Sequence, residues 1–304
     1  MQVFVVDGMS DDGTRAVVTE LCQHYPSLHL IDNKQQLTPF AFNLGIHAGG
    51  EADYVQIVGA RHILSSNYLS SCLTKLQENS TIWGVGGQIQ NVSVNEVGAC
   101  ISAVLSSSFG VGMGNFRTMT ASGFTDTVTS PMYPYWVFEK IGFFDQTLIR
   151  NQDDDFNFRI TEAGGKLYLI HDIHLKYYVR ATLNGVRKQY FQYGYWKVFV
   201  NQKHGKMTTI RQLFPPAFVA YLCLSILLPL VPSWLKILYA FPLVLYLFGV
   251  LFFGQKVSPR GLFFQTARLF PLIHISYGLG YMLGIFDFLI RGKKPSDKQK
   301  ELSR

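Results

Sequence analysis

The sequence predicts an α/β domain with a mostly parallel sheet and helices on both faces, followed by C-terminal transmembrane helices. Short apolar strands alternate with amphipathic helices through the first part of the chain, as they do in parallel sheets. Three uncharged stretches, each near the ~20 residues that span a hydrocarbon core, occupy the C-terminal part. Only 15% of the 304 residues are charged, against about a quarter in soluble domains.

The first expected unit is a strand over residues 3–6 that ends in Asp7, a polar turn, and a helix over residues 14–24. The alternation continues with strands over 28–31 and 54–58 and helices over 39–48 and 68–76. Ligands of such sheets bind beyond the carboxyl ends of the strands, which is where Asp7 falls.

The middle of the chain is less regular. Residues 83–123 are rich in Gly, Ser and Asn, which predicts long loops or short helices over the sheet. A helix is expected over residues 153–163, ended by Gly164 and Gly165, and a basic-aromatic helix over residues 183–202.

The three uncharged stretches cover residues 212–235, 237–255 and 269–286 and predict an integral membrane protein; the alternative is buried helices of a soluble core. We therefore divide the chain into a domain of residues 1–205 and a membrane region of residues 206–304 with two or three transmembrane or interfacial helices.

The number of crossings depends on the terminal basic residues. Three crossings with a cytoplasmic first domain would place them outside, against the positive-inside tendency. These residues are Arg291, Lys293, Lys294, Lys298 and Lys300. Two crossings fit better, and the third stretch, with Pro271 and His274, is expected to lie in the interface or to re-enter.

Charge and cysteine usage narrow the environment. Residues 1–205 carry a net charge of −2 and residues 206–304 one of +9, with the basic residues bracketing apolar runs as at anionic lipid. The first part has no basic-aromatic strip, so nucleic acid is not expected as a partner. The four cysteines are far apart, which predicts free thiols in a reducing compartment, and the start lacks the pattern of a secretory signal. We expect the first part in the cytoplasm.

The first candidate site surrounds Asp7, with Ser10, Asp12 and Thr14 among small residues. A carboxylate at a strand tip accepts hydrogen bonds from a base N–H or from ribose hydroxyls. Capping of the following helix by Asp12 or Thr14 is the equally weighted alternative.

The second candidate site is RNQDDDFNFR at residues 150–159. Three consecutive carboxylates repel one another, which points to a cation, a substrate hydroxyl or a basic partner nearby. One of them is placed to act as general base on a sugar hydroxyl. A solvated helix start is the alternative.

The third candidate site is QYFQYGYWK at residues 189–197. Aromatic rings beside amide and ammonium groups suit a sugar, whose C–H faces stack on rings while its hydroxyls need hydrogen-bond partners. An aromatic belt at a membrane surface is the competing interpretation.

These motifs, in this order and before apolar segments, resemble the family 2 glycosyltransferases of the GT-A fold, of the type that builds succinoglycan and related bacterial exopolysaccharides. FGVGMGNFRT and VFEKIGFFDQTLIRNQDDDFNFR occur in the same order as in such enzymes. The resemblance implies that Asp7, with Ser10 and Asp12 beside it, contacts the nucleoside of a UDP-sugar donor. It implies that Asp153 is the general base. It also places Gln192, Trp196, Asp154 and Asp155 near the acceptor.

The resemblance further implies an inverting transfer, with Mg²⁺ or Mn²⁺ neutralising the leaving diphosphate. The acceptor would be a lipid-linked saccharide used in capsule or exopolysaccharide assembly. The enzyme would then lie in the inner (cytoplasmic) membrane with its catalytic domain facing the cytoplasm, beside other polysaccharide-assembly proteins.

The sequence also departs from the family. The usual first strand, of the V-I-I-P-x-Y-N-E kind, does not precede the Asp7 turn, which should expose sheet edges. The metal-binding Asp-x-Asp is replaced by Val58-Gly-Ala-Arg61-His62, and we take Arg61 as a donor to the diphosphate. Tyr195 replaces the Arg before Trp196.

These departures keep a second function open: a catalytically degenerate or truncated paralogue that acts as a scaffold in a polysaccharide-assembly complex. A processive synthase is disfavoured, because a polymer channel needs more membrane helices than three stretches supply.

Overall fold

The computed structural model describes residues 1–304 except 51, 113–115, 208 and 296–304. The strands are β1 (Val3–Asp7), β2 (Leu28–Asp32), β3 (Tyr54–Gln56), β4 (His62–Leu64), β5 (Ile82–Val92), β6 (Gly123–Thr125), β7 (Met132–Pro134) and β8 (Lys166–Tyr178). The helices of the first part are α1 (Thr14–His24), α2 (Thr38–Ala48), α3 (Tyr68–Glu78), α4 (Glu96–Leu105), α5 (Ser108–Val111), α6 (Tyr135–Ile141), α7 (Gln152–Glu162) and α8 (Leu183–His204). Those of the second part are α9 (Phe214–Leu224), α10 (Ser233–Val257), α11 (Phe263–Ala267) and α12 (Leu269–Gly284).

The strands form two separate sheets. β1 and β2 pair in parallel and make a two-stranded sheet of their own. The larger sheet has the order β3-β7-β5-β8-β4, with β6 also on β8, and among the described strands its only parallel pair is β5–β8. The α/β class is confirmed, but the pairing is mixed, because the short strands β3, β4, β6 and β7 pair antiparallel with their neighbours.

The loop expectation for residues 83–123 is wrong for its first part, because β5 is a long buried strand in the middle of the larger sheet. The glycines that suggested a loop have a packing role. A Cβ at Gly84 would lie 2.6 Å from both Leu167 and Tyr133, and one at Gly87 would lie 2.6 Å from the Tyr68 ring. Large side chains from neighbouring elements therefore pack directly against the β5 backbone at these glycines.

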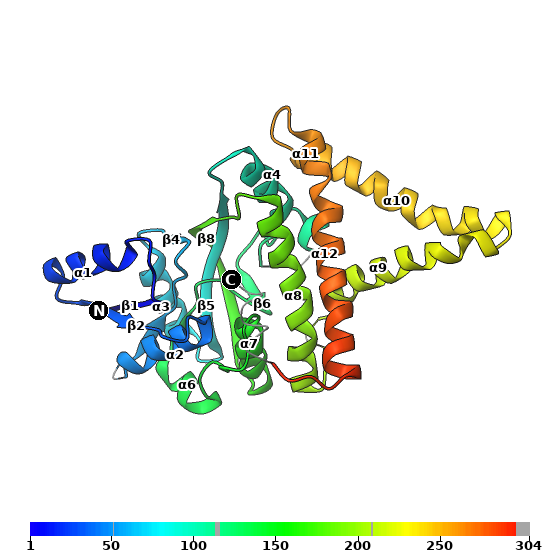
Figure 1. Ribbon diagram of the computed structural model, residues 1–304. Helices are drawn as coiled ribbons and strands as arrows, with labels where there is room; N and C mark the ends of the chain where they lie inside the picture. The colour runs from blue at the N-terminus through cyan, green and yellow to red at the C-terminus, as the bar shows by residue number, and fades with distance from the viewer. Residues whose placement is uncertain (51, 113–115, 208, 296–304) are drawn as a thin grey trace.

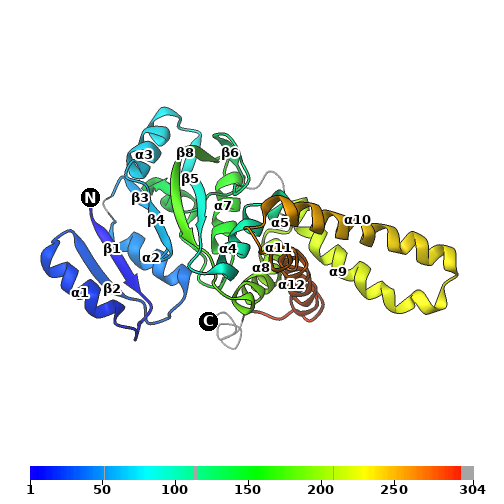
Figure 2. The same ribbon diagram turned by 90° about the horizontal axis from the view of Figure 1, so that it is seen from above.

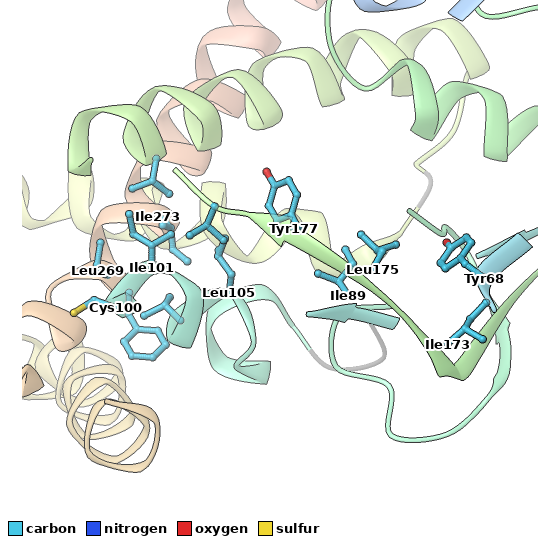
Figure 3. Close-up of a cluster of buried hydrophobic side chains, with 14 of the residues drawn as sticks. Tyr68, Ile89, Cys100, Ile101, Leu105, Ile173, Leu175, Tyr177, Leu269 and Ile273 are labelled. Carbon is cyan, nitrogen blue, oxygen red and sulfur yellow. The ribbon is translucent and has the colours of Figure 1, made fainter. Parts of the chain in front are cut away.

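The main hydrophobic core crosses from the sheet into the C-terminal part of the chain. Ile89 of β5 and Leu175 of β8 pack in the same buried cluster as Ile101 of α4 and Ile273 of α12 (Figure 3). The core is therefore continuous across residue 205.

Helix α12 packs along α8 through small residues (Figure 1). A Cβ on Gly194 of α8 would overlap the carbonyl oxygen of Tyr277, and one on Gly280 of α12 would overlap that of Phe191. Glycine at both positions lets the two backbones approach closely. Tyr195 then donates a hydrogen bond of 3.0 Å to Asp287, just beyond α12.

Helices α9 and α10 form an arm that projects from the body, and α12 runs across the base of this arm (Figures 1 and 2). The Tyr221 and Tyr239 rings stack with centroids 4.4 Å apart, and each hydroxyl donates to the backbone carbonyl of the other residue. The arm thus holds together as a hairpin.

Three described helical segments are long and apolar enough to cross a membrane: Ile210–Leu230, Ser233–Val257 and Phe263–Ile290. In the most apolar window of each, 11% of the first two but 44% of the third is buried inside the protein. The difference arises because α12 packs along α8 over its length, whereas most of the α9–α10 arm projects from the body.

Candidate active site

A single cavity of about 2670 Å³ links the sheets to the helical arm. In the described residues, β1 pairs only with β2 and β3 only with β7, so each strand has one free edge. Both strands contribute to the cavity wall, as do the first turn of α7 and residues of α9, α10 and α12. Residues along its length include Gly8, Val55, Asp153, Tyr193, Phe218 and Tyr246.

The first turn of α7 carries the three consecutive carboxylates, and the structure separates them. Asp155 is fully buried, where it accepts hydrogen bonds from Lys203 (2.6 Å), His204 (2.8 Å) and Arg159 (3.1 Å). Asp154 pairs with Lys197 at 2.9 Å. Asp153 is exposed to the cavity. Two carboxylates thus anchor the helix and the third faces the cavity.

The residue before α7 fixes this arrangement. Asn151 adopts a left-handed conformation with φ of 60°, which asparagine tolerates better than most residues. Its amide donates to Asp154 at 3.1 Å and to the Tyr193 carbonyl at 3.4 Å. The turn that presents Asp153 is therefore tied to α8.

Asp153 lines the cavity, where protein atoms surround its solvent-accessible carboxylate. This burial, followed by the negative charge of Asp154, raises the pKa of Asp153 to about 6. A carboxylate with a pKa in this range is ionised at neutral pH and is a stronger proton acceptor than an ordinary aspartate.

Arginines surround the cavity next to Asp153. The guanidinium groups of Arg61 and Arg117 lie 5.1 and 5.3 Å from the centroid of the Tyr177 ring. Arg61 also donates a hydrogen bond to the Tyr177 hydroxyl at 3.2 Å. Arg150 donates to Gln192 at 3.2 Å. Burial, and then the charges of Arg180 and Arg61, lower the pKa of Arg150. Cations gathered against their mutual repulsion favour an anionic ligand.

The predicted nucleoside site is only partly in the cavity. Asp7 is 6% exposed and accepts hydrogen bonds from the Ser10 amide and hydroxyl and from Arg15. Burial acts to raise the pKa of Asp7, but these hydrogen bonds and the Arg15 charge outweigh it and hold the pKa below its ordinary value. Asp12 is exposed and accepts from Thr14. For Ser10 and Asp12 the structure therefore shows a role in the turn, and Gly8 and Arg61 line the cavity instead.

The predicted acceptor residues divide in the same way. Asp154 lines the cavity, but Asp155 does not, because its three partners hold it under α7. Trp196 is 2% exposed and packs against Phe199 and Phe288 on the α12 side of α8. Gln192 is buried and supports Arg150. Asp155 and Trp196 do not line the cavity, since helical spacing turns them away from it, and their role at the acceptor stays a prediction.

Several cavity residues were missed from the sequence. Arg117, Tyr177 and Arg211 lie outside the three motifs. Three others lie inside these motifs: Arg150, Tyr193 and Lys197. The sequence shows their charges and rings but not that their side chains point into the cavity.

The segment that should hold a divalent cation does not fit one. Residues 58–62 present Arg61 and His62 in place of carboxylates, and Arg61 is engaged by Tyr177 and the Tyr178 carbonyl. Across the described residues there is no group of three His, Cys, Asp or Glu side chains suited to a metal ion. Mg²⁺ and Mn²⁺ prefer oxygen ligands, so the arginine and histidine of this segment do not suit them.

No protein-family profile matches the chain. Among curated proteins, it is similar to the succinoglycan biosynthesis protein ExoA of Rhizobium meliloti (strain 1021), 24% identical over 94% of this chain and 86% of that protein. It is also 30% identical to a dolichyl N-acetyl-alpha-D-glucosaminyl phosphate 3-beta-D-2,3-diacetamido-2,3-dideoxy-beta-D-glucuronosyltransferase of Methanococcus voltae, over 75% of this chain and 71% of that protein.

The chain belongs to the family 2 glycosyltransferases. Among solved structures, this glycosyltransferase is similar to the mannosyltransferase PcManGT from Pyrobaculum calidifontis, crystallised with GDP-Man and Mn²⁺. The TM-score is 0.63 at 14% identity, over 94% of this chain and 78% of that one. This likeness confirms the GT-A fold.

Proposed function

We propose that this glycosyltransferase is membrane-anchored and inverting, and that it transfers a sugar from a UDP-sugar to a lipid-linked saccharide in capsule or exopolysaccharide biosynthesis. The observation that carries the proposal is Asp153, a cavity-facing carboxylate with a pKa of about 6 beside a group of arginines. The relatives support the substrate classes, since one is a succinoglycan biosynthesis protein and the other a glycosyltransferase that acts on a dolichyl-phosphate glycan.

Asp153 acts as the general base. It accepts the proton of the acceptor hydroxyl as the hydroxyl oxygen bonds to the anomeric carbon, while the bond from that carbon to the diphosphate oxygen breaks. One in-line displacement inverts the anomeric configuration. Arg61, Arg117 and Arg150 supply positive charge for the leaving diphosphate, as bidentate donors to its oxygens.

The placement in the membrane follows from the two kinds of apolar helix. The α9–α10 hairpin crosses the bilayer and returns, because both helices are exposed over most of their length. Helix α12 lies in the membrane surface, with one face on α8 and an apolar face outward. The outward residues of this segment include Leu279, Met282, Leu283, Phe286, Leu289 and Ile290.

Two crossings leave the catalytic domain and Lys293 and Lys294, which follow α12, on one side of the membrane. With that side cytoplasmic, the arrangement agrees with the positive-inside tendency. We therefore place the enzyme in the inner membrane with its active site at the cytoplasmic surface. A lipid-linked acceptor is confined to this surface, so tethering raises its effective concentration.

The test is Asp153→Asn in membranes, measured as transfer of labelled sugar from UDP-sugars into the lipid fraction and as polymer production. We expect a loss of about 10²- to 10⁴-fold, the range for removal of a general base. Asp172→Asn is the matched control, because the Asp172 side chain is 92% exposed and does not line the cavity. Normal polymer production by Asp153→Asn would support the scaffold function instead.

A further inference from the structure

The active-site cavity continues past Asp153 to the base of the helical arm. Beyond the first turn of α7 it is lined by Thr209, Arg211 and Gln212, and then by Pro215 and Phe218 of α9. Tyr246 of α10 and three residues of α12 complete this end of the cavity: Ile273, His274 and Tyr277. One connected space therefore joins the general base to helices that we place in and on the membrane.

The boundary between the two ends of the cavity is polar. Arg211 precedes α9 and is held by Asp126 at 2.5 Å, with its side chain beside the loop at Gly112. Tyr277 of α12 lies within electrostatic reach of both Asp154 and Arg211. The charged first turn of α7 and the start of the arm are thus neighbours.

The far end of the cavity is apolar and structurally fixed. The Phe218 and Tyr246 rings are in contact, with centroids 4.3 Å apart. The Tyr246 hydroxyl hydrogen-bonds with His274 at 2.9 Å, and the other ring nitrogen of His274 lies 3.1 Å from the Phe109 carbonyl oxygen. Helices α9, α10 and α12 therefore meet around an aromatic wall about one turn into α9.

We propose that this end of the cavity, the lipid seat lined by Phe218, Tyr246 and Ile273, holds the chain of a long-chain lipid phosphate acceptor. The phosphate lies at Arg211, and the saccharide that it carries extends to Asp153. The inference rests on the proposed function and deepens it. Along the cavity, the carboxylate of Asp153 is followed by Arg211 and then by the aromatic wall at the membrane helices. A lipid-linked saccharide presents the matching groups in the same order: a hydroxyl, a phosphate and a hydrocarbon chain.

Apolar contact gives the seat a dependence on chain length. Each methylene removed from water contributes separately to binding, so a long isoprenoid chain binds far more tightly than a short one with the same phosphate. Arg211 alone recognises the charge and does not distinguish a lipid from free phosphate.

The experiment is photolabelling of the full chain in lipid nanodiscs with undecaprenyl phosphate that carries a diazirine on its isoprenoid chain. We expect crosslinks in the peptides that contain Phe218 and Tyr246, suppressed by excess undecaprenyl phosphate. Geranyl phosphate and inorganic phosphate at the same concentration should not suppress them. Equal suppression by either of these two probes overturns the proposal, because it shows recognition of phosphate without the chain.

Phe218→Ala supplies the variant, and Phe248→Ala is the matched control because Phe248 lies on α10 with 66% of its surface exposed. We expect Phe218→Ala to lower the crosslink yield at Tyr246 by about fivefold, from lost apolar contact, with Phe248→Ala unchanged. An equal effect of both variants, or none of Phe218→Ala, overturns the seat. A thermal scan shows whether a variant unfolds. If one does, the positions of the crosslinks in the wild-type protein still decide whether the lipid chain lies at Phe218 and Tyr246.

Labelling needs neither donor nor turnover, so this test is separate from that of the proposed function. Asp153→Asn should label like the wild type. Normal labelling together with normal polymer production by Asp153→Asn would refute the catalytic role and leave the lipid seat standing.

Discussion

The two sides of the active-site cavity differ in how completely the chain builds them. On the α7–α8–α12 side, the carboxylates of α7 are held by Lys197, Lys203 and His204, and glycines bring the helices into backbone contact. On the β1–β2 side, a separate two-stranded sheet borders the cavity with a free edge. The base and acceptor end is therefore preorganised. The nucleotide end depends on cations from other parts of the fold: Arg61 between β3 and β4, Arg117 between α5 and β6, and Arg150 just before α7.

The largest effect should come from filling the glycine contact between α8 and α12. Gly194→Ala adds a Cβ that overlaps the Tyr277 carbonyl, and backbone cannot give way cheaply. We expect a loss of about 3 kcal/mol or more in the free energy of unfolding, seen as a lower unfolding midpoint in detergent. Gly8→Ala on the other side is the control, because its Cβ would make ordinary contacts at 3.7 Å. Equal destabilisation by both variants would contradict the claim that the α7–α8–α12 side is the more tightly packed side of the cavity.

Local sequence signals predicted most of the helices of the first domain but little of the strand pairing. The helix over residues 14–24 was predicted with its observed bounds, and the starts of α7 and α8 to within one residue, because polar turns and periodicity are local. The strand β5 was missed because Gly84 and Gly87 are explained only by Tyr133 and Tyr68, which reach them across the fold. Antiparallel pairing by strands of three residues leaves no periodic signal.

The sequence identified several residues that line the cavity, but not the directions in which their neighbours point. Asp153 was predicted to be the general base and Arg61 to contact the diphosphate, and both line the cavity. Asp155 and Trp196 belong to the same motifs but point into packing, since neighbouring positions on a helix face different directions. Arg117 was not identified because only the fold brings it beside Tyr177.

The second effect concerns pH and tests the acceptor side alone. Since burial raises the pKa of Asp153 to about 6, the carboxylate is protonated below that value and cannot accept the acceptor proton. The value of kcat/KM should therefore fall about tenfold for each pH unit below 6 and stay level above it. The measurement is sugar transfer into the lipid fraction across a pH series.

His62 is the control for this profile, because an unperturbed histidine would titrate in the same range. Burial, and then the charges of Arg61 and Arg117, lower the pKa of His62 to about 4, so it is neutral at pH 6. His62→Gln should leave the midpoint in place. If the midpoint disappears in His62→Gln, the titrating group is His62 and not Asp153, which contradicts a general base on α7.

The smallest effect concerns the donor side. If Arg61 neutralises the diphosphate, Arg61→Ala should weaken UDP binding by about tenfold in a calorimetric titration, the cost of one charge-assisted contact. Arg61→Lys keeps the charge but loses the planar guanidinium with its paired N–H donors. Its UDP affinity should therefore fall between those of the wild type and Arg61→Ala. Arg187→Ala is the charge-matched control, since Arg187 is exposed on α8 and bonds to Asn184.

Because Arg61 follows β3 and reaches Tyr177 of β8, it lies on the larger sheet and not on the separate β1–β2 unit. A tenfold loss would therefore show that the larger sheet carries the diphosphate while β1 and β2 contribute only the nucleoside end. Unchanged UDP affinity in Arg61→Ala would count against this division, and would leave Arg117 and Arg150 as the cations that hold the donor.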